Sequence, residues 1–238
     1  AVMAGEEHYR SYGELLYSVQ TGRTAFEKVY GEPVFDFLSH HPGQASLFDQ
    51  AMVSVHGRET GAMLAAYDFA GVSVLADVGG GNGSVLTAVL QKYPAMRGVL
   101  FDLPAVAERA KADLRAAGLA ERCQVVGGSF FEAVPGGADA YLLRHIIHDW
   151  DEERCGQILR NIHRAMNEGG RLLVVEGVVP PGNGPSFTKL LDLTMLAIPG
   201  GRERTREEYE ALFRAGGFRL TRVVPTEAEV SVIEGQKA

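Results

Sequence analysis

One histidine and two glutamates in this sequence are placed so that together they could remove a proton from a hydroxyl group. His148 follows one predicted strand, Glu176 ends the next, and Glu203 lies in the loop 200–205. If the two strands are neighbours in a sheet, His148 and Glu176 face one crevice. A histidine held by carboxylates is a general base, because the carboxylate fixes the imidazole tautomer and stabilises the imidazolium. A phenol, whose pKa is about 10, needs such a base at neutral pH.

Each of these residues also has a simpler interpretation. A histidine after a strand is often a core or capping residue, and Glu203 alone would be a solvated loop charge. The chemical interpretation depends on a second motif that lies upstream.

This second motif is a glycine-rich segment. The apolar run 72–78 ends in it, and residues 86–93 follow with apolar side chains at i, i+3, i+4 and i+7, the spacing of one helix face. The pattern predicts a buried strand, a tight turn and a helix. Gly79, Gly81 and Gly83 lack a Cβ and tolerate positive φ, so a ligand can approach the backbone of the turn closely.

The acid before the glycines indicates the charge of that ligand. The spacing is not the G-x-G-x-x-G that seats a pyrophosphate on a helix N-terminus, and Asp77 precedes it. A carboxylate there repels a pyrophosphate but suits a cation, such as a sulfonium that carries an amino acid tail. We therefore favour S-adenosylmethionine over NAD. A glycine turn that binds nothing is the alternative.

A second acid, Asp102, ends the predicted strand 97–103, about 20 residues past the glycines. In doubly wound folds, an acid at this position accepts hydrogen bonds from ribose hydroxyls. The alternative is a simple cap for the predicted helix 105–117. With the glycine turn upstream, ribose binding is the better interpretation.

These residues need a scaffold that brings strand ends together. Strands are predicted at 72–78, 97–103, 122–126, 138–143 and 171–175. Because helices alternate with them, the pattern predicts a doubly wound parallel sheet that binds ligands beyond the carboxyl ends of its strands. Five candidate residues fall at or just after such ends: Asp77, Asp102, Ser129, His148 and Glu176. Two final strands, 218–224 and 229–234, suggest an antiparallel pair.

The first part of the chain precedes this scaffold and is predominantly helical in pattern. We therefore divide the chain into a helical extension, residues 1–70, which we expect to cover the substrate pocket, and a cofactor-binding catalytic domain, residues 71–238. In the extension, Phe48, Met52 and Val55 share one helix face. That face covers the sheet domain, a substrate or a partner.

Composition excludes several classes of function. The formal net charge is −7, which argues against nucleic acid, since phosphate contacts need clustered Lys and Arg. The two cysteines, Cys123 and Cys155, are too far apart for a metal knuckle and are expected to be reduced thiols. We found no signal sequence and no apolar run of about 18 residues. These features predict a soluble, cytoplasmic protein without a structural metal.

Five motifs occur in an order that resembles one family. They are Val78-Gly79-Gly80-Gly81-x-Gly83, Phe101-Asp102-Leu103-Pro104, His148-Asp149-Trp150, Glu176, and Pro199-Gly200-Gly201-x-Glu203-Arg204-Thr205. The chain resembles the S-adenosylmethionine-dependent small-molecule O-methyltransferases of the caffeic-acid type, including their bacterial natural-product branch. The resemblance implies a Rossmann-like sheet of seven strands, the last antiparallel. It also implies methyl transfer to a hydroxyl, expected to be phenolic, of an aromatic product of secondary metabolism such as an antibiotic.

The resemblance implies a role for each matching residue. His148 would be the base, and Glu176 and Glu203 would orient it. The glycine turn would cradle the methionine part of the cofactor. The residues implied to bind the cofactor are Asp77, Gly79, Gly81, Gly83, Asp102, Leu103, Ser129, Phe130 and Arg144. Those implied to line the substrate pocket are Phe48, Met52, His145, Asp149 and Met195.

The resemblance also bears on partners. The resemblance implies a homodimer, since family members usually associate through an N-terminal domain, which we expect to be missing from this sequence. The loop 197–199 lacks an asparagine that the plant enzymes use on phenolic substrates, so lignin-type acceptors are not implied.

Four alternatives remain. The same fold could bind the cofactor and carry out hydroxylation or decarboxylation, although such enzymes need no phenol base and His148 is present. The chain could be an inactive cofactor-binding fragment. An NAD-dependent oxidoreductase, or a metal hydrolase that uses His145, His148 and Asp149, fits the motifs less well.

Overall fold

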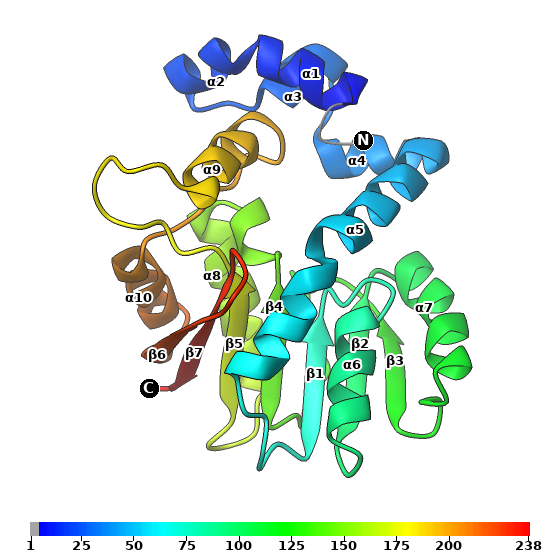
Figure 1. The fold of residues 1–238 in the computed structure, drawn as a ribbon. Coiled ribbons are helices and arrows are strands. Elements are labelled where there is room, and N and C mark those ends of the chain that lie inside the picture. Colours follow the sequence, from blue (N-terminus) through cyan, green and yellow to red (C-terminus); the bar gives the residue numbers. More distant parts are fainter. Residues whose placement is uncertain (1–4) are drawn as a thin grey trace.

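A mixed sheet of seven strands forms the centre of the molecule (Figure 1). The structure, a computed structural model, describes the backbone of residues 5–238 and their side chains except those of residues 49–50 and 53–56. The strands are β1 (Val74–Val78), β2 (Arg97–Asp102), β3 (Cys123–Gly127), β4 (Ala140–Arg144), β5 (Arg171–Glu176), β6 (Phe218–Pro225) and β7 (Ser231–Lys237). Their spatial order is β3-β2-β1-β4-β5-β7-β6.

The strand directions confirm the predicted fold. Strands β1 to β5 pair in parallel, and β7 runs antiparallel to both β5 and β6. The chain moves outward from β1 to β3 and then returns to place β4 on the other side of β1. Doubly wound folds bind ligands beyond the carboxyl ends of the strands at such a change of direction, which here falls between β1 and β4.

Helices cover both faces of the sheet because its strands bury side chains on both sides. In β5, Leu173 and Val175 join one apolar core, and Leu172 and Val174 join the other. This alternation is the period of two that a strand imposes. Helices α6 (Ser84–Lys92) and α7 (Pro104–Ala116) contribute to the first core, and helices α8 (Glu152–Ala165) and α10 (Arg206–Ala215) to the second.

Between residue 5 and the sheet, the structure describes five helices: α1 (Glu6–Gly13), α2 (Leu15–Thr21), α3 (Ala25–Tyr30), α4 (Val34–His40) and α5 (Pro42–Ala66). In Figure 1, α1 to α4 lie above the carboxyl ends of the strands, together with α9 (Phe187–Ala197). A third core joins α3 and α4 to the end of α9. Helix α5 runs down to the sheet, where Met63 packs into the first core. None of the helices described is both long and apolar enough to cross a membrane.

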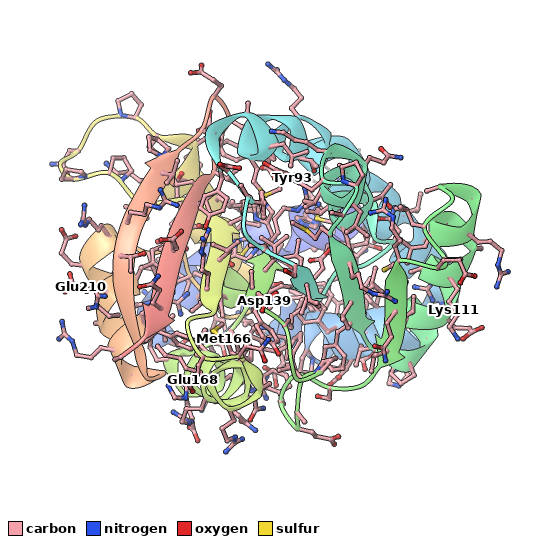
Figure 2. All side chains as sticks on the ribbon, turned by 90° about the horizontal axis from the view of Figure 1, so that it is seen from below. Tyr93, Lys111, Asp139, Met166, Glu168 and Glu210 are labelled. Carbon is pink, nitrogen blue, oxygen red and sulfur yellow. The ribbon has the colours of Figure 1, made fainter. Side chains whose placement is uncertain are left out.

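At the other end of the sheet, where β1 to β5 begin, side-chain hydrogen bonds connect neighbouring segments. Figure 2 views it from below, with Asp139 near the centre. The carboxylate of Asp139 accepts the backbone N–H of Val74 at 2.9 Å and the side-chain amide of Asn167 at 3.0 Å. These bonds tie the start of β1 to the segment that precedes β5.

Candidate active site

The turn from β1 to α6 has the positive φ angles that its glycines predict. Gly79, Gly81 and Gly83 all have positive φ, at 73°, 57° and 78°. A Cβ at Gly79 would collide with the side chain of Ile146, and a Cβ at Gly83 would lie 2.8 Å from Leu100 Cδ1. Gly79 and Gly83 therefore have no room for a side chain, whereas a Cβ at Gly81 would meet nothing within 4 Å.

Two acids lie beside this turn. The carboxylate of Asp102 accepts the N–H of Gly81 at 2.8 Å and the N–H of Leu103 at 2.7 Å. Asp77 is buried, and its Oδ2 has no hydrogen-bond partner among the described residues. Burial raises the pKa of Asp77 to about 7, although Arg144 acts in the opposite direction. A buried carboxylate with one unpartnered oxygen, next to a glycine turn, fits a ligand that carries positive charge and N–H donors.

Three other residues predicted to bind the cofactor are Arg144, which ends β4, and Ser129 and Phe130, which follow β3. The Phe130 ring lies 3.9 Å from the position that a Cβ at Gly79 would take. The guanidinium of Arg144 donates to Thr60 Oγ1 of α5 at 3.0 Å. The Ser129 hydroxyl accepts the N–H of Phe131 at 3.3 Å. The individual binding roles of these residues stay predictions.

His148 lies in a one-turn 3₁₀ helix, η2 (Ile147–Asp149), which follows β4. Its Nδ1 is 2.6 Å from Glu203 Oε1, and both side chains are buried. Its Nε2 is 3.6 Å from Asp149 Oδ1. A carboxylate this close to Nδ1 keeps a proton on that nitrogen, so Nε2 is the nitrogen that can take up another.

The charges around His148 favour the protonated form of its imidazole. Burial alone would lower the pKa of His148, but Asp149, Glu203 and Glu176 together raise it to about 10. Burial also raises the pKa of Asp149 to about 7, and Glu176 and Glu203 add to that rise. Three carboxyl groups, those of Asp149, Glu176 and Glu203, thus act on one imidazole and favour its protonated form. Among the described residues, no group of three or more His, Cys, Asp or Glu side chains could hold a metal ion.

Glu176 acts on a different part of His148 from the one we expected. Its Oε1 accepts the backbone N–H groups of Ile146, Ile147 and His148, at 3.0, 2.7 and 3.2 Å. Its Oε2 accepts the hydroxyl of Tyr209 at 2.7 Å. The carboxylate therefore holds the backbone of the turn and makes no hydrogen bond to the imidazole. We did not predict this role of Glu176, because the sequence pattern did not indicate the 3₁₀ turn.

Sequence reasoning missed Glu59, a buried residue of α5. Its Oε2 is 2.8 Å from His145 Nε2, and the rings of His145 and His148 are 5.0 Å apart between centroids. Burial lowers the pKa of His145 well below its ordinary value, and the positive charges of His148 and Arg144 add to this effect. No pattern near Glu59 in the sequence could have indicated a partner so distant along the chain.

The remaining residues predicted to line the substrate pocket lie in three places. Asp149 is beside His148, as described above. Met195 is buried on α9. Phe48 and Met52 are half-buried on α5, and Phe48 lines an apolar cavity of about 220 Å³ among the N-terminal helices. The third residue of that predicted face, Val55, lies outside the described side chains. A role in substrate binding stays a prediction for each.

Comparison with known proteins gives the family. The family model described as the O-methyltransferase domain matches residues 12–219. The phenazine O-methyltransferase PhzM of Lysobacter antibioticus is 45% identical over 236 residues, which are 99% of this chain and 69% of PhzM. The aclacinomycin 10-hydroxylase RdmB of Streptomyces purpurascens is 41% identical over 208 residues, which are 87% of this chain and 56% of RdmB.

Solved structures agree in fold. The mitomycin 7-O-methyltransferase MmcR superposes with a TM-score of 0.94 at 39% identity, over 100% of this chain and 70% of MmcR. The O-methyltransferase NcsB1 of neocarzinostatin biosynthesis, crystallised with S-adenosyl-L-homocysteine and 1,4-dihydroxy-2-naphthoic acid, gives a TM-score of 0.89 at 32% identity. That match covers 98% of this chain and 70% of NcsB1. The seven-stranded fold and the extent of these matches lead to one conclusion: the chain belongs to the O-methyltransferase domain family.

Proposed function

We propose that this protein transfers the methyl group of S-adenosylmethionine to a phenolic hydroxyl of an aromatic small-molecule natural product, with His148 as the general base. The observation that carries the proposal is the 2.6 Å contact between His148 Nδ1 and the buried Glu203 carboxylate. The relatives support the substrate class, since one is named for phenazine and another was crystallised with a dihydroxynaphthoic acid.

The residues around the glycine turn fit the proposed cofactor. Asp77 and the turn would hold its methionine part, and Asp102 would accept hydrogen bonds from its ribose. When bound, S-adenosylmethionine supplies an activated methyl group on a sulfonium, and S-adenosylhomocysteine is the product. The unpartnered Oδ2 of Asp77 suits the positive charge of this molecule.

His148 would take the hydroxyl proton of the acceptor on Nε2, while Nδ1–H donates to Glu203. With a pKa of about 10 the imidazole is protonated at neutral pH, and it can act as a base only after that pKa falls. A positive charge held nearby lowers the pKa of an imidazole. The cationic donor, when it is in place, would thus lower the pKa of His148 toward neutrality. Positioned proton removal typically contributes about 10²–10⁴-fold to the rate.

Mass spectrometry and calorimetry test the proposal together. The protein is incubated with S-adenosylmethionine and a panel of hydroxyphenazines and hydroxynaphthoic acids, and a product heavier by one methyl group is expected. His148→Ala should reduce turnover at least about 100-fold and leave cofactor affinity nearly unchanged. His40→Ala, at an exposed histidine that pairs with Glu32, is the control and should retain wild-type turnover. A His148→Ala variant with full turnover would remove the general-base assignment.

Hydroxylation is the second candidate, because the relative RdmB is named a hydroxylase. The same mass spectra separate the two reactions, since hydroxylation adds an oxygen atom instead of a methyl group. Binding without either product would favour an inactive cofactor-binding chain. A homodimer and a cytoplasmic location stay predictions.

A further inference from the structure

The short turn that carries His148 has charged partners at both ends. A one-turn 3₁₀ helix has few internal hydrogen bonds, so groups outside it determine its conformation. At its amino end, the Glu176 carboxylate accepts N–H groups of the turn. At its carboxyl end, the buried guanidinium of Arg204 donates to the carbonyl oxygens of Ile147 and Trp150, both at 3.2 Å.

The two charges match the polarity of the turn. An anion next to backbone N–H groups and a cation next to backbone carbonyls both stabilise a helical turn. Arg204 has no exposed surface, and Glu152 keeps it paired through a 3.0 Å contact to Nη2. Burial lowers the pKa of Arg204, but Cys155, Glu152 and Glu176 raise it above its ordinary value. The guanidinium is therefore charged at all relevant pH values.

The loop that carries Arg204 also carries the acid that holds the imidazole. Glu203, the preceding residue, is 2.6 Å from His148 Nδ1. A Cβ at Gly201 would collide with the backbone carbonyl of His148, so this loop lies directly against the turn. The backbone and the ring of His148 are thus fixed by consecutive residues of one loop.

We propose that Arg204 is a positioning residue for the base: it fixes the backbone of the His148 turn so that the imidazole meets Glu203. This inference rests on the proposed function and deepens it. Arg204 contacts backbone carbonyls, Glu152 and the Cys155 thiol, which itself donates to the carbonyls of Ile147 and Trp150. The effect of Arg204 on the reaction passes through His148.

Arg204→Lys tests the geometry without changing the charge. An ammonium group is a point donor and cannot span two carbonyls as the planar guanidinium does. If the turn loosens, the His148–Glu203 hydrogen bond weakens and the pKa of His148 falls, by about one unit or more. A neutral substitution would confuse this measurement, because loss of a nearby positive charge raises the same pKa.

The primary readout is the titration of the His148 ring by NMR, which does not depend on turnover. The expected result is a lower pKa for His148 in Arg204→Lys than in the wild type. Turnover should fall about 10-fold or more through kcat, because a ring that no longer meets Glu203 does not hold Nε2 in place to take the proton, and this loss outweighs the lower pKa; the Kd for S-adenosylmethionine should be unchanged. Arg202→Lys is the matched control. Its exposed side chain contacts the same Glu152 at 2.9 Å, and neither turnover nor the His148 titration should change.

Arg204→Ala supplies a second test. Guanidinium chloride at concentrations that leave the protein folded should restore part of its turnover by refilling the vacated site, and should not affect Arg202→Ala.

A His148 titration that is identical in wild type and Arg204→Lys would overturn the inference, as would wild-type turnover in Arg204→Ala. A wild-type protein that transfers no methyl group, but whose His148 titration shifts in Arg204→Lys, would overturn the proposed function and leave the positioning role in place. If Arg204→Ala does not fold, the Arg204→Lys titration decides.

Discussion

Nε2 of His145 lies 2.8 Å from the Glu59 carboxylate, although 86 residues separate the two in the chain. This contact joins α5 to the residue that follows β4. The backbone of His145 has φ +53°, the one positive φ among the described residues other than glycine. Such a conformation costs about 1–3 kcal/mol and persists only when its surroundings enforce it. Glu59 is therefore part of what holds the backbone between Arg144 and the His148 turn.

Glu59→Ala is expected to lower the free energy of unfolding by about 1–3 kcal/mol, because it removes one partner of a buried, charge-assisted hydrogen bond. Alanine is a good helix former, so α5 itself carries no penalty. Urea denaturation measures the change. Arg58→Ala, at an exposed position next to it in α5, is the control and should stay within about 0.5 kcal/mol of wild type. Equal losses in both variants would contradict the structural role of Glu59.

Gly79→Ala should destabilise the protein and weaken cofactor binding. A left-handed backbone costs an alanine about 1–2 kcal/mol, and its Cβ would also collide with Ile146. Gly182→Ala is a matched control, because Gly182 has φ +74°, close to the +73° of Gly79, with nothing within 4 Å of its added Cβ. Calorimetry should show weaker S-adenosylmethionine binding for Gly79→Ala alone. Unchanged affinity in that variant would place the cofactor elsewhere.

Asp77→Asn should stabilise the ligand-free protein at pH 8 while it weakens cofactor binding. The pKa of Asp77 is raised from 3.8 to about 7, so the folded state holds a proton that the unfolded state releases between these values. Stability from this group is present at low pH and is lost as pH rises through about 7. Asparagine removes that loss, worth on the order of 2–4 kcal/mol at pH 8.

The pH dependence supplies the control for this prediction. Near pH 4 the Asp77 carboxyl is protonated in the folded protein, so the advantage of Asp77→Asn should shrink toward zero there. Denaturation curves of both proteins at pH 4, 6 and 8 measure the trend. An advantage that does not vary with pH would mean that packing, and not the buried charge, separates the two proteins.

The parts of the fold that depend on local patterns were predictable from the sequence. The glycines after β1 mark a turn because positive φ and close approach need them, and strand–helix alternation predicts the parallel sheet. The pairing of His148 with Glu203 was also expected, but from the family resemblance. Spacing along the chain could not have placed a loop residue against a histidine 55 residues away.

The parts that were missed depend on contacts between distant segments. Glu176 was assigned to the imidazole because both lie at strand ends, and the structure shows that it accepts backbone N–H groups instead. Neither the 3₁₀ turn nor the role of Glu59 has a local signal. Arg204 did have a local signal, since it follows Glu203 in the motif of residues 199–205. Only the structure, however, shows that its buried guanidinium lies against the His148 turn.

Glu203 and Arg204 are joined by a single peptide bond, and this adjacency limits how the enzyme can be redesigned. Substituting an exposed side chain of the loop, such as that of Arg202, leaves the positions of Glu203 and Arg204 unchanged. Inserting or deleting one residue between Gly201 and Thr205 would displace the acid and the cation at the same time. Libraries aimed at new acceptors should therefore keep the length of this loop constant and vary side chains elsewhere.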